Sequence, residues 1–252
     1  MASFRTEAII LRRRDYRETD RIVTFFSKDF GKITGIAFGA KKSTKRFSNC
    51  LEPFVLSRIF FSQRPNRDLI RLESCEMLSG RKRLAEDVNR LAHASYLAEL
   101  ATLLTADRDR NEDLFLLLAA CMDLIEDGKR PEDVTRIFEV RFLTLLGYRL
   151  NLTVCGACQA PLLEQGKSYF QTSEGSLQCE KCAKDRSLAV SEGTLKTLAF
   201  AQDQPLEKAG RLRISRGAER EARKALESFL VHLMQKRPKS LDFIRRIREE
   251  KK

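Results

Sequence analysis

The first eighty residues alternate apolar and polar positions in short stretches that are rich in Ile, Val, Phe and Thr. Gly, Asp or Pro separates these stretches, which is typical of β-strands joined by turns. Gly31 and the segment SQRPNRD at 62–68 indicate two hairpins. The pattern predicts five strands, at Phe4–Leu11, Ile22–Ser27, Lys32–Phe38, Pro53–Phe61 and Asp68–Cys75. Because closure removes exposed strand edges, we expect a five-stranded barrel of the OB-fold type.

From about Leu84 the apolar residues recur every three or four positions, which is the spacing of an amphipathic helix. One helix is expected from Leu84 to Leu104. A second begins after Asn111, a suitable N-cap, and a third begins at Pro131. Short connections between them predict a helical bundle. The helical pattern returns at 191–202, 217–237 and 240–250.

Two C-x2-C pairs, separated by twenty residues, contain four of the seven cysteines: Cys155, Cys158, Cys179 and Cys182. This spacing is typical of a zinc ribbon or a related structural zinc site. The segment between the pairs has the pattern of a hairpin with Gly175 in its turn. Four thiolates fill a tetrahedral site and leave no position open for water or substrate. The pattern therefore predicts one structural Zn²⁺ per chain.

Two other interpretations of the cysteines remain open: a dithiol redox site and a catalytic zinc. A redox C-x-x-C normally begins a helix after a strand, and a catalytic zinc often needs a histidine or carboxylate. The two histidines, His93 and His232, lie far from the cysteines in the sequence. The remaining cysteines, Cys50, Cys75 and Cys121, are expected to be buried small hydrophobic residues rather than parts of a disulfide framework.

These patterns predict an α+β multidomain protein. Its parts are an N-terminal five-stranded OB-fold β-barrel, an α-helical bundle domain and a zinc-ribbon-like insertion with four cysteines. The expected boundaries are 1–80 for the nucleic-acid-binding barrel, 81–154 with 188–252 for the helical domain, and 155–187 for the zinc-binding segment.

Basic charge is concentrated at the two ends of the chain. Residues 1–80 and residues 191–252 each carry 16 basic and nine acidic side chains, whereas residues 81–190 carry 15 and 17. The whole chain has a net charge of +12, which favours a polyanionic partner such as nucleic acid. No apolar run approaches the roughly twenty residues that span a bilayer, and the first residues do not form a signal peptide. A cytoplasmic protein without membrane association is expected.

Two segments, LRRRDYRETDR at 11–21 and FGAKKSTKRF at 38–47, combine cations with aromatic rings and are expected to form loops beside the barrel. This combination suits single strands, because cations follow phosphates and rings stack on unpaired bases. For Phe38 we expect a place in the core, whereas Tyr16 and Phe47 could lie in the core or on the surface. The predicted nucleic-acid contacts are Arg13, Arg14, Arg17, Arg21, Lys41, Lys42, Lys45 and Arg46.

Catalytic motifs are missing from the sequence. The segment around GAKKS fails the phosphate-binding motif G-x-x-x-x-G-K-[ST], because position 40 is Ala and position 42 is Lys. No nucleophile elbow or H-E-x-x-H pattern occurs either. The sequence therefore predicts a binding protein rather than an enzyme.

Three segments of the chain form a recognisable set: TEAIILRRRDYRETDRIVTFFSKDFGKITGIAFGAKKS at 6–43, FEVRFLTLLGYRLNLTVCGAC at 138–158 and SLDFI at 240–244. Together they resemble the RecO family of bacterial recombination mediators. The resemblance covers essentially the whole chain in the family's motif order. The chain has Arg149 and Leu150 where many members have a proline after the tyrosine. Some members lack the cysteines, so a metal is not essential to the family's activity.

The resemblance implies binding to single-stranded and double-stranded DNA, annealing of complementary strands, and association with the nucleoid. It also implies that the protein acts with RecR and with the acidic C-terminal tail of single-strand-binding protein to help load RecA. Candidate contacts for that tail are Arg136, Arg141 and Arg149. An RNA-binding or transcription-associated protein with an OB-fold and a zinc ribbon is the alternative.

Overall fold

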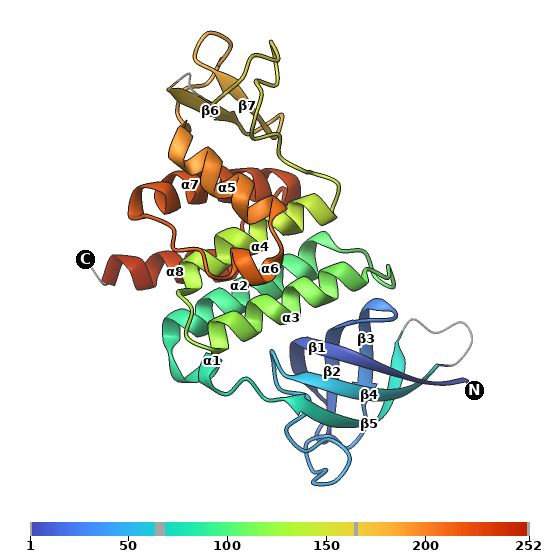
Figure 1. Ribbon diagram of the computed structural model, residues 1–252. Helices are drawn as coiled ribbons and strands as arrows, with labels where there is room; N and C mark the ends of the chain where they lie inside the picture. Colours follow the sequence, from blue (N-terminus) through green and yellow to red (C-terminus); the bar gives the residue numbers. More distant parts are fainter. Residues whose placement is uncertain (1, 64–68, 164–165, 251–252) are drawn as a thin grey trace. The chain divides into compact units, whose positions relative to one another are not determined.

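The computed structural model describes residues 2–63, 69–163 and 166–250 (Figure 1). They form two compact units. The first contains the residues up to Glu126 together with those from Phe243, and the second contains Asp127–Asp242. None of the described helices is both long and apolar enough to cross a membrane. The three-domain division expected from the sequence stays a prediction.

A closed barrel begins the first unit. Its strands are β1 (Ala2–Tyr16), β2 (Asp20–Ser27), β3 (Gly31–Ala37), β4 (Leu56–Gln63) and β5 (Ile70–Ser79), in the order β1-β2-β3-β5-β4. All neighbours are antiparallel except β3 and β5, which run parallel. The five predicted strands and the barrel are thus confirmed. The expected hairpin at 62–68 falls mainly on residues 64–68, which lie outside the described residues.

Strand β1 is much longer than predicted, because different parts of it pair with two strands, β4 and β2, to close the barrel. It pairs with β4 through Ala2–Ile9 and with β2 through Ala8–Tyr16, with a register shift between Ile10 and Arg12. The prediction of a loop over 11–21 was therefore wrong. Only Arg17–Thr19 form the turn, and Arg17 has φ of 54°. Polar side chains can occupy this strand because its backbone groups pair with β2.

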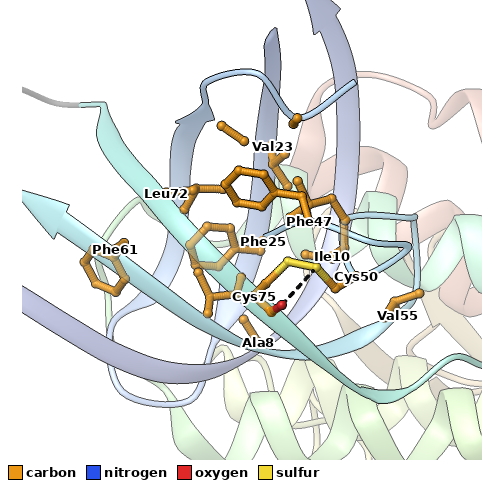
Figure 2. Close-up of a cluster of buried hydrophobic side chains, with 14 of the residues drawn as sticks. Ala8, Ile10, Val23, Phe25, Phe47, Cys50, Val55, Phe61, Leu72 and Cys75 are labelled. Atoms are coloured by element: carbon orange, nitrogen blue, oxygen red, sulfur yellow. Dashed lines mark hydrogen bonds between the residues drawn. A yellow bond between two sulfur atoms is a disulfide. The ribbon is translucent and has the colours of Figure 1, made fainter. Parts of the chain in front are cut away.

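The barrel core is a cluster of buried apolar side chains that includes Phe25, Phe47 and Phe61 (Figure 2). Phe47, which the sequence left open, is 2% exposed. The placement of Phe38 in the core was wrong, since it is 37% exposed. The chain turns away from the barrel directly after β3, and the side chain of Phe38 lies outside the core.

Cys50 and Cys75 are both buried, as predicted, but they are joined by a disulfide with a Cα–Cα distance of 6.1 Å (Figure 2). The expectation that no disulfide forms was therefore wrong. Sequence spacing carries no signal for this pair, because the two residues are 25 positions apart and meet only when the barrel closes. The backbone N–H of Cys75 also donates to the Arg46 carbonyl oxygen at 2.9 Å.

The first unit also contains three helices that follow the barrel: α1 (Arg83–Glu86), α2 (Val88–Leu104) and α3 (Glu112–Glu126). The predicted N-cap of α3 is present, because Asn111 Oδ1 accepts a hydrogen bond from Leu114 N at 2.9 Å. Arg81 connects α3 to the barrel. Its buried guanidinium contacts Asp123 at 2.7 Å and the Phe54 carbonyl at 2.8 Å.

The second unit packs α4 (Pro131–Leu145), α5 (Glu192–Asp203) and α7 (Arg216–Met234) against one another. The same unit contains a small sheet with the strand order β7-β6-β8. Its strands are β6 (Lys167–Gln171), β7 (Ser176–Cys179) and β8 (Ala189–Ser191). The β6–β7 hairpin was predicted. It packs closely on α7, because a Cβ at Gly175 would lie 2.4 Å from Phe229 Cζ. This unit also contains α6 (Leu206–Ala209) and the start of α8 (Lys239–Glu250), whose residues from Phe243 belong to the first unit.

Candidate metal centre and nucleic-acid interface

The four predicted metal ligands come together at one end of the β6–β7 hairpin. The Sγ atoms of Cys155, Cys158, Cys179 and Cys182 all lie within 4.8 Å of one another. Cys158 Sγ and Cys179 Sγ are 3.8 Å apart. Tetrahedral zinc with Zn–S bonds of about 2.3 Å requires sulfur atoms about 3.8 Å apart. The cluster therefore fits a tetrahedral metal ion.

Backbone hydrogen bonds hold the cysteines in this arrangement. Cys155 N donates to the Ala160 carbonyl at 2.8 Å, and Gly156 N donates to the Leu177 carbonyl at 2.8 Å. The second bond connects the first cysteine pair to strand β7. Cys179 N lies 3.4 Å from Cys155 Sγ, which accepts its hydrogen. This last donor is placed to stabilise negative charge on the Cys155 sulfur.

The clustered thiols differ in acidity because each has different hydrogen-bond partners. Burial acts to raise the pKa of Cys155, but the backbone N–H groups of Cys158, Cys179 and Ala157 outweigh it and lower the pKa to about 6. Hydrogen bonds with Cys158 and Cys179, followed by burial, raise the pKa of Cys182 to about 12. Four neighbouring thiols cannot all ionise by themselves, whereas a bound divalent cation deprotonates its coordinating thiols.

The surroundings favour a closed structural site over the alternatives. The first C-x-x-C pair lies in a turn and the second spans the end of β7 and the turn after it, so neither lies at the start of a helix as in dithiol redox sites. Among the described residues, this is the one group of three or more potential ligands, and it contains no histidine or carboxylate. His93 is buried in α2 of the first unit, and His232 is exposed on α7.

A second candidate site lies on the barrel, where four residues from four strands form one row. The Cα partners are Arg14 with Ile22, Ile22 with Ile36, and Ile36 with Arg71. Side chains of one row point to the same face of a sheet. This is the outer face, because the neighbouring positions Val23, Ala37 and Leu72 belong to the core. An exposed arginine thus stands at each end of the row.

Positions two residues away along each strand extend this outer surface. Arg12 and Tyr16 lie on either side of Arg14 on β1, and Phe38 follows Ile36 just beyond the end of β3. Tyr16 is 38% exposed, with the Arg17 guanidinium 5.2 Å from its ring. We call this surface the arginine face and define it by Arg12, Arg14, Tyr16, Phe38 and Arg71.

The basic loop, residues 38–47, is held beside the β1–β2 turn by two hydrogen bonds. Gly39 N donates to Asp20 Oδ1, and Lys41 N donates to the Thr19 carbonyl, both at 2.9 Å. The Gly39 N–H holds the pKa of Asp20 below its usual value, against the effect of burial. The fold therefore brings together the two basic segments that the sequence analysis identified.

Three of the predicted nucleic-acid contacts are ion-paired. Arg13 and Arg21 lie 2.7 and 3.5 Å from Glu52, and Lys41 lies 3.2 Å from Asp15. A hydrogen bond from Lys41, opposed by desolvation, is the main reason that the pKa of Asp15 is below its usual value. The charges of Arg21 and Arg13 act in the same direction. These cations are partly neutralised within the protein.

The other five predicted contacts are exposed and have no acidic partner within ion-pair distance in the described part of the chain: Arg14, Arg17, Lys42, Lys45 and Arg46. Arg46 donates instead to the Phe38 carbonyl at 2.9 Å. Sequence reasoning missed Arg12, Arg71 and the exposure of Phe38. The alternation of β1 could have indicated Arg12, but only the β3–β5 pairing places Arg71 on the same face.

One candidate for docking an acidic tail was wrong. Arg136 is 1% exposed and pairs with Glu139 at 2.9 Å and Glu227 at 3.6 Å inside the second unit, so it is closed to a partner. Arg141 donates to the backbone carbonyls of Ala201 and Gln204. Arg149 is exposed but lies 2.6 Å from Asp203.

Comparisons with known proteins cover both units. The family model described as "Recombination protein O N terminal" matches residues 1–81, and "Recombination protein O C terminal" matches residues 85–242. A DNA repair protein RecO from Syntrophus aciditrophicus is 38% identical over 244 residues, 95% of this chain and 94% of that protein. The one from Anaeromyxobacter sp. strain K is 37% identical, and the match covers 91% of this chain and 91% of that protein. The one from Pelotomaculum thermopropionicum is 34% identical, and the match covers 98% of this chain and 95% of that protein.

Proposed function

Because the chain belongs to the RecO family of DNA repair proteins, we propose that it acts as a recombination mediator. In this role it binds single-stranded and double-stranded DNA and anneals complementary strands. Together with RecR it helps to load RecA onto DNA that is coated with single-strand-binding protein. The barrel would supply the main DNA-binding surface.

The observation that carries this proposal is the set of exposed cations on and beside the arginine face. Arg14, Arg17, Lys42 and Lys45 have no acidic partner among the described residues, so they are available to phosphates. Neutralising phosphates releases condensed counterions, which supplies most of the sequence-independent affinity. Arg13, Arg21 and Lys41 would join them only where phosphates replace Asp15 and Glu52 as partners.

Annealing by such a surface needs no covalent chemistry. Cations reduce the repulsion between two phosphate backbones and raise the local concentration of the strands. The chain's residues would act by binding and holding DNA, in agreement with the missing catalytic motifs in the sequence. We therefore propose that the protein is not an enzyme, and that it works in the cytoplasm at the nucleoid.

The four cysteines would hold one Zn²⁺ as a structural ion. Their sulfur geometry and all-thiolate composition support zinc, which prefers tetrahedral thiolate sites. The ion would fix the hairpin and thereby the segment that leads into α5. The expected three-domain division, with the cysteine segment as an insertion at 155–187, belongs to this proposal.

Binding in a salt series tests the DNA-binding role. We expect the wild-type chain to bind single-stranded and duplex DNA, with log K falling linearly against log salt. Changing Arg14, Lys42 and Lys45 to Gln should lower the single-strand slope by about 2, at about 0.7 per lost phosphate contact. The measurement is an electrophoretic mobility shift with DNA and with RNA of the same sequence.

A matched control removes the same charge elsewhere in the first unit. Arg5, Lys82 and Arg83 are exposed and lie outside the arginine face and the basic loop. Changing these three to Gln should leave the slope closer to that of the wild type. A strong preference for RNA over DNA would support the alternative function instead, and equal slopes for both triple variants would remove the barrel surface from the proposal.

A further inference from the structure

Phe38 is a large aromatic residue on the surface of the barrel rather than in its core. It is 37% exposed, whereas Phe47 at the other end of the same basic loop is 2% exposed. A ring that the core does not need, on an otherwise cationic surface, is available to bind a ligand. This ring was not among the expected nucleic-acid contacts.

The surroundings of Phe38 hold it in place and surround it with positive charge. Gly39 N is fixed by Asp20, and the Phe38 carbonyl accepts a hydrogen bond from Arg46 Nη2 at 2.9 Å. The Arg71 guanidinium lies 5.5 Å from the ring centroid, within the range of a cation–π contact, and its Nε lies 3.3 Å from Glu73, which a bound phosphate would replace as its partner. The backbone on both sides of the ring is therefore anchored, and two guanidinium groups lie next to it.

We propose that Phe38 is a stacking platform for an unpaired base, with Arg46 and Arg71 binding the phosphates beside that base. This inference rests on the proposed DNA-binding function and assigns the recognition of unpaired bases to the ring of Phe38. In a duplex, each base is covered by its neighbours, whereas an unpaired base offers a free π-face to an aromatic ring. Stacking is sequence-tolerant, since every base has such a face.

The position of Tyr16 supports the same geometry. Tyr16 pairs with Asp20 in the β1–β2 register, and Asp20 binds Gly39, the neighbour of Phe38. The backbone positions that carry the two rings therefore lie on either side of β2, about 10 Å apart at the usual strand spacing. Arg17 covers the ring of Tyr16 as Arg71 covers that of Phe38. One strand crossing the face would meet both rings.

The test compares three probes of equal length: an oligothymidine, an abasic strand with the same sugar–phosphate backbone, and a duplex. Phe38→Ala should weaken oligothymidine binding roughly 5- to 150-fold, the effect of losing one base–aromatic stack. It should leave binding to the abasic strand and to the duplex unchanged. Phe38→Tyr keeps the ring and should keep the wild-type affinity for all three probes.

Met77→Ala is the matched control, because Met77 is a large exposed apolar residue on β5 outside the arginine face. It should change none of the three affinities. Equal losses for Phe38→Ala on all probes, or no loss on oligothymidine, would overturn the platform while leaving DNA binding intact. A wild-type protein that binds none of the probes would overturn the proposed function as well. If Phe38→Ala does not fold, equal wild-type affinity for the thymidine and abasic strands overturns the platform.

Discussion

Cys155 has the most constrained surroundings of the four clustered cysteines. It is fully buried, its N–H donates to the Ala160 carbonyl, and its sulfur accepts the N–H of Cys179. Removing this thiolate would leave three ligands and open a coordination position. It would also remove one of the contacts between the first cysteine pair and the hairpin.

Cys155→Ala should abolish metal binding and lower the stability of the second unit by more than about 4 kcal/mol, which is typical of losing a structural metal. Thermal unfolding and zinc content per chain measure this. Single-stranded DNA binding at low temperature should change little, because the proposed contacts lie on the barrel. Cys121→Ala, at a buried cysteine of α3 outside the cluster, should keep the metal.

Unchanged stability of Cys155→Ala combined with lost DNA binding would contradict a structural role.

The clustering of the four cysteines could be predicted, because the spacing within each C-x-x-C pair is local and has few physical solutions. The exposure of Phe38 and the burial of Arg136 could not be predicted, because each residue contacts a neighbour from a distant segment. Arg71 reaches Phe38 through the β3–β5 pairing, and Glu227 reaches Arg136 from α7.

Glu221 connects α7 to the start of α5. Its Oε2 accepts hydrogen bonds from Ser191 N at 2.8 Å, Ser191 Oγ at 2.7 Å and Thr194 Oγ1 at 2.5 Å. Burial acts to raise the pKa of Glu221, but the bonds from Thr194 and Ser191 outweigh it and hold the pKa below its usual value. The ionised carboxylate therefore stabilises this junction.

Glu221→Gln should lower the free energy of unfolding by about 1–3 kcal/mol at pH 7, the worth of hydrogen bonds to a charged group. The folded pKa is the lower one, so this stabilisation is complete above the unfolded pKa of about 4.3. It is lost as the pH falls through the folded value. Urea unfolding at pH 7 and towards pH 3 should show the difference between the variant and the wild type shrinking.

Glu207→Gln makes the same substitution at an exposed position of α6, and should stay within about 0.5 kcal/mol of the wild type at both pH values. A loss for Glu221→Gln that does not depend on pH would contradict the role of the charged carboxylate.

Hydrophobic periodicity predicted the five barrel strands and the long helices, because each buries one apolar face. It did not predict β8 or α6, which are three and four residues long, or the charged half of β1. β8 and the charged half of β1 exist because the neighbouring strands β6 and β2 satisfy their backbone groups, a condition that the local sequence does not contain. α6 is a single turn whose backbone hydrogen bonds are local, and it is too short to show a hydrophobic period.

For the whole molecule, the distribution of charge matters more than its total. The net charge of +12 predicts attraction to nucleic acid but not where the nucleic acid binds. We propose that the barrel supplies that place, because its register gathers cations from β1, β5 and the basic loop on one outer surface. Cations that form ion pairs within the protein are partly neutralised, and those that form none are available to phosphates.

The most direct measurement is the rate at which complementary strands anneal when they are coated with single-strand-binding protein. The wild-type chain and the control triple variant at Arg5, Lys82 and Arg83 should both accelerate annealing. The triple variant at Arg14, Lys42 and Lys45 should lose most of this acceleration at moderate salt. If the wild type gives no acceleration, or if the Arg14 triple variant matches it, the cationic barrel surface is not the means by which this protein acts on DNA.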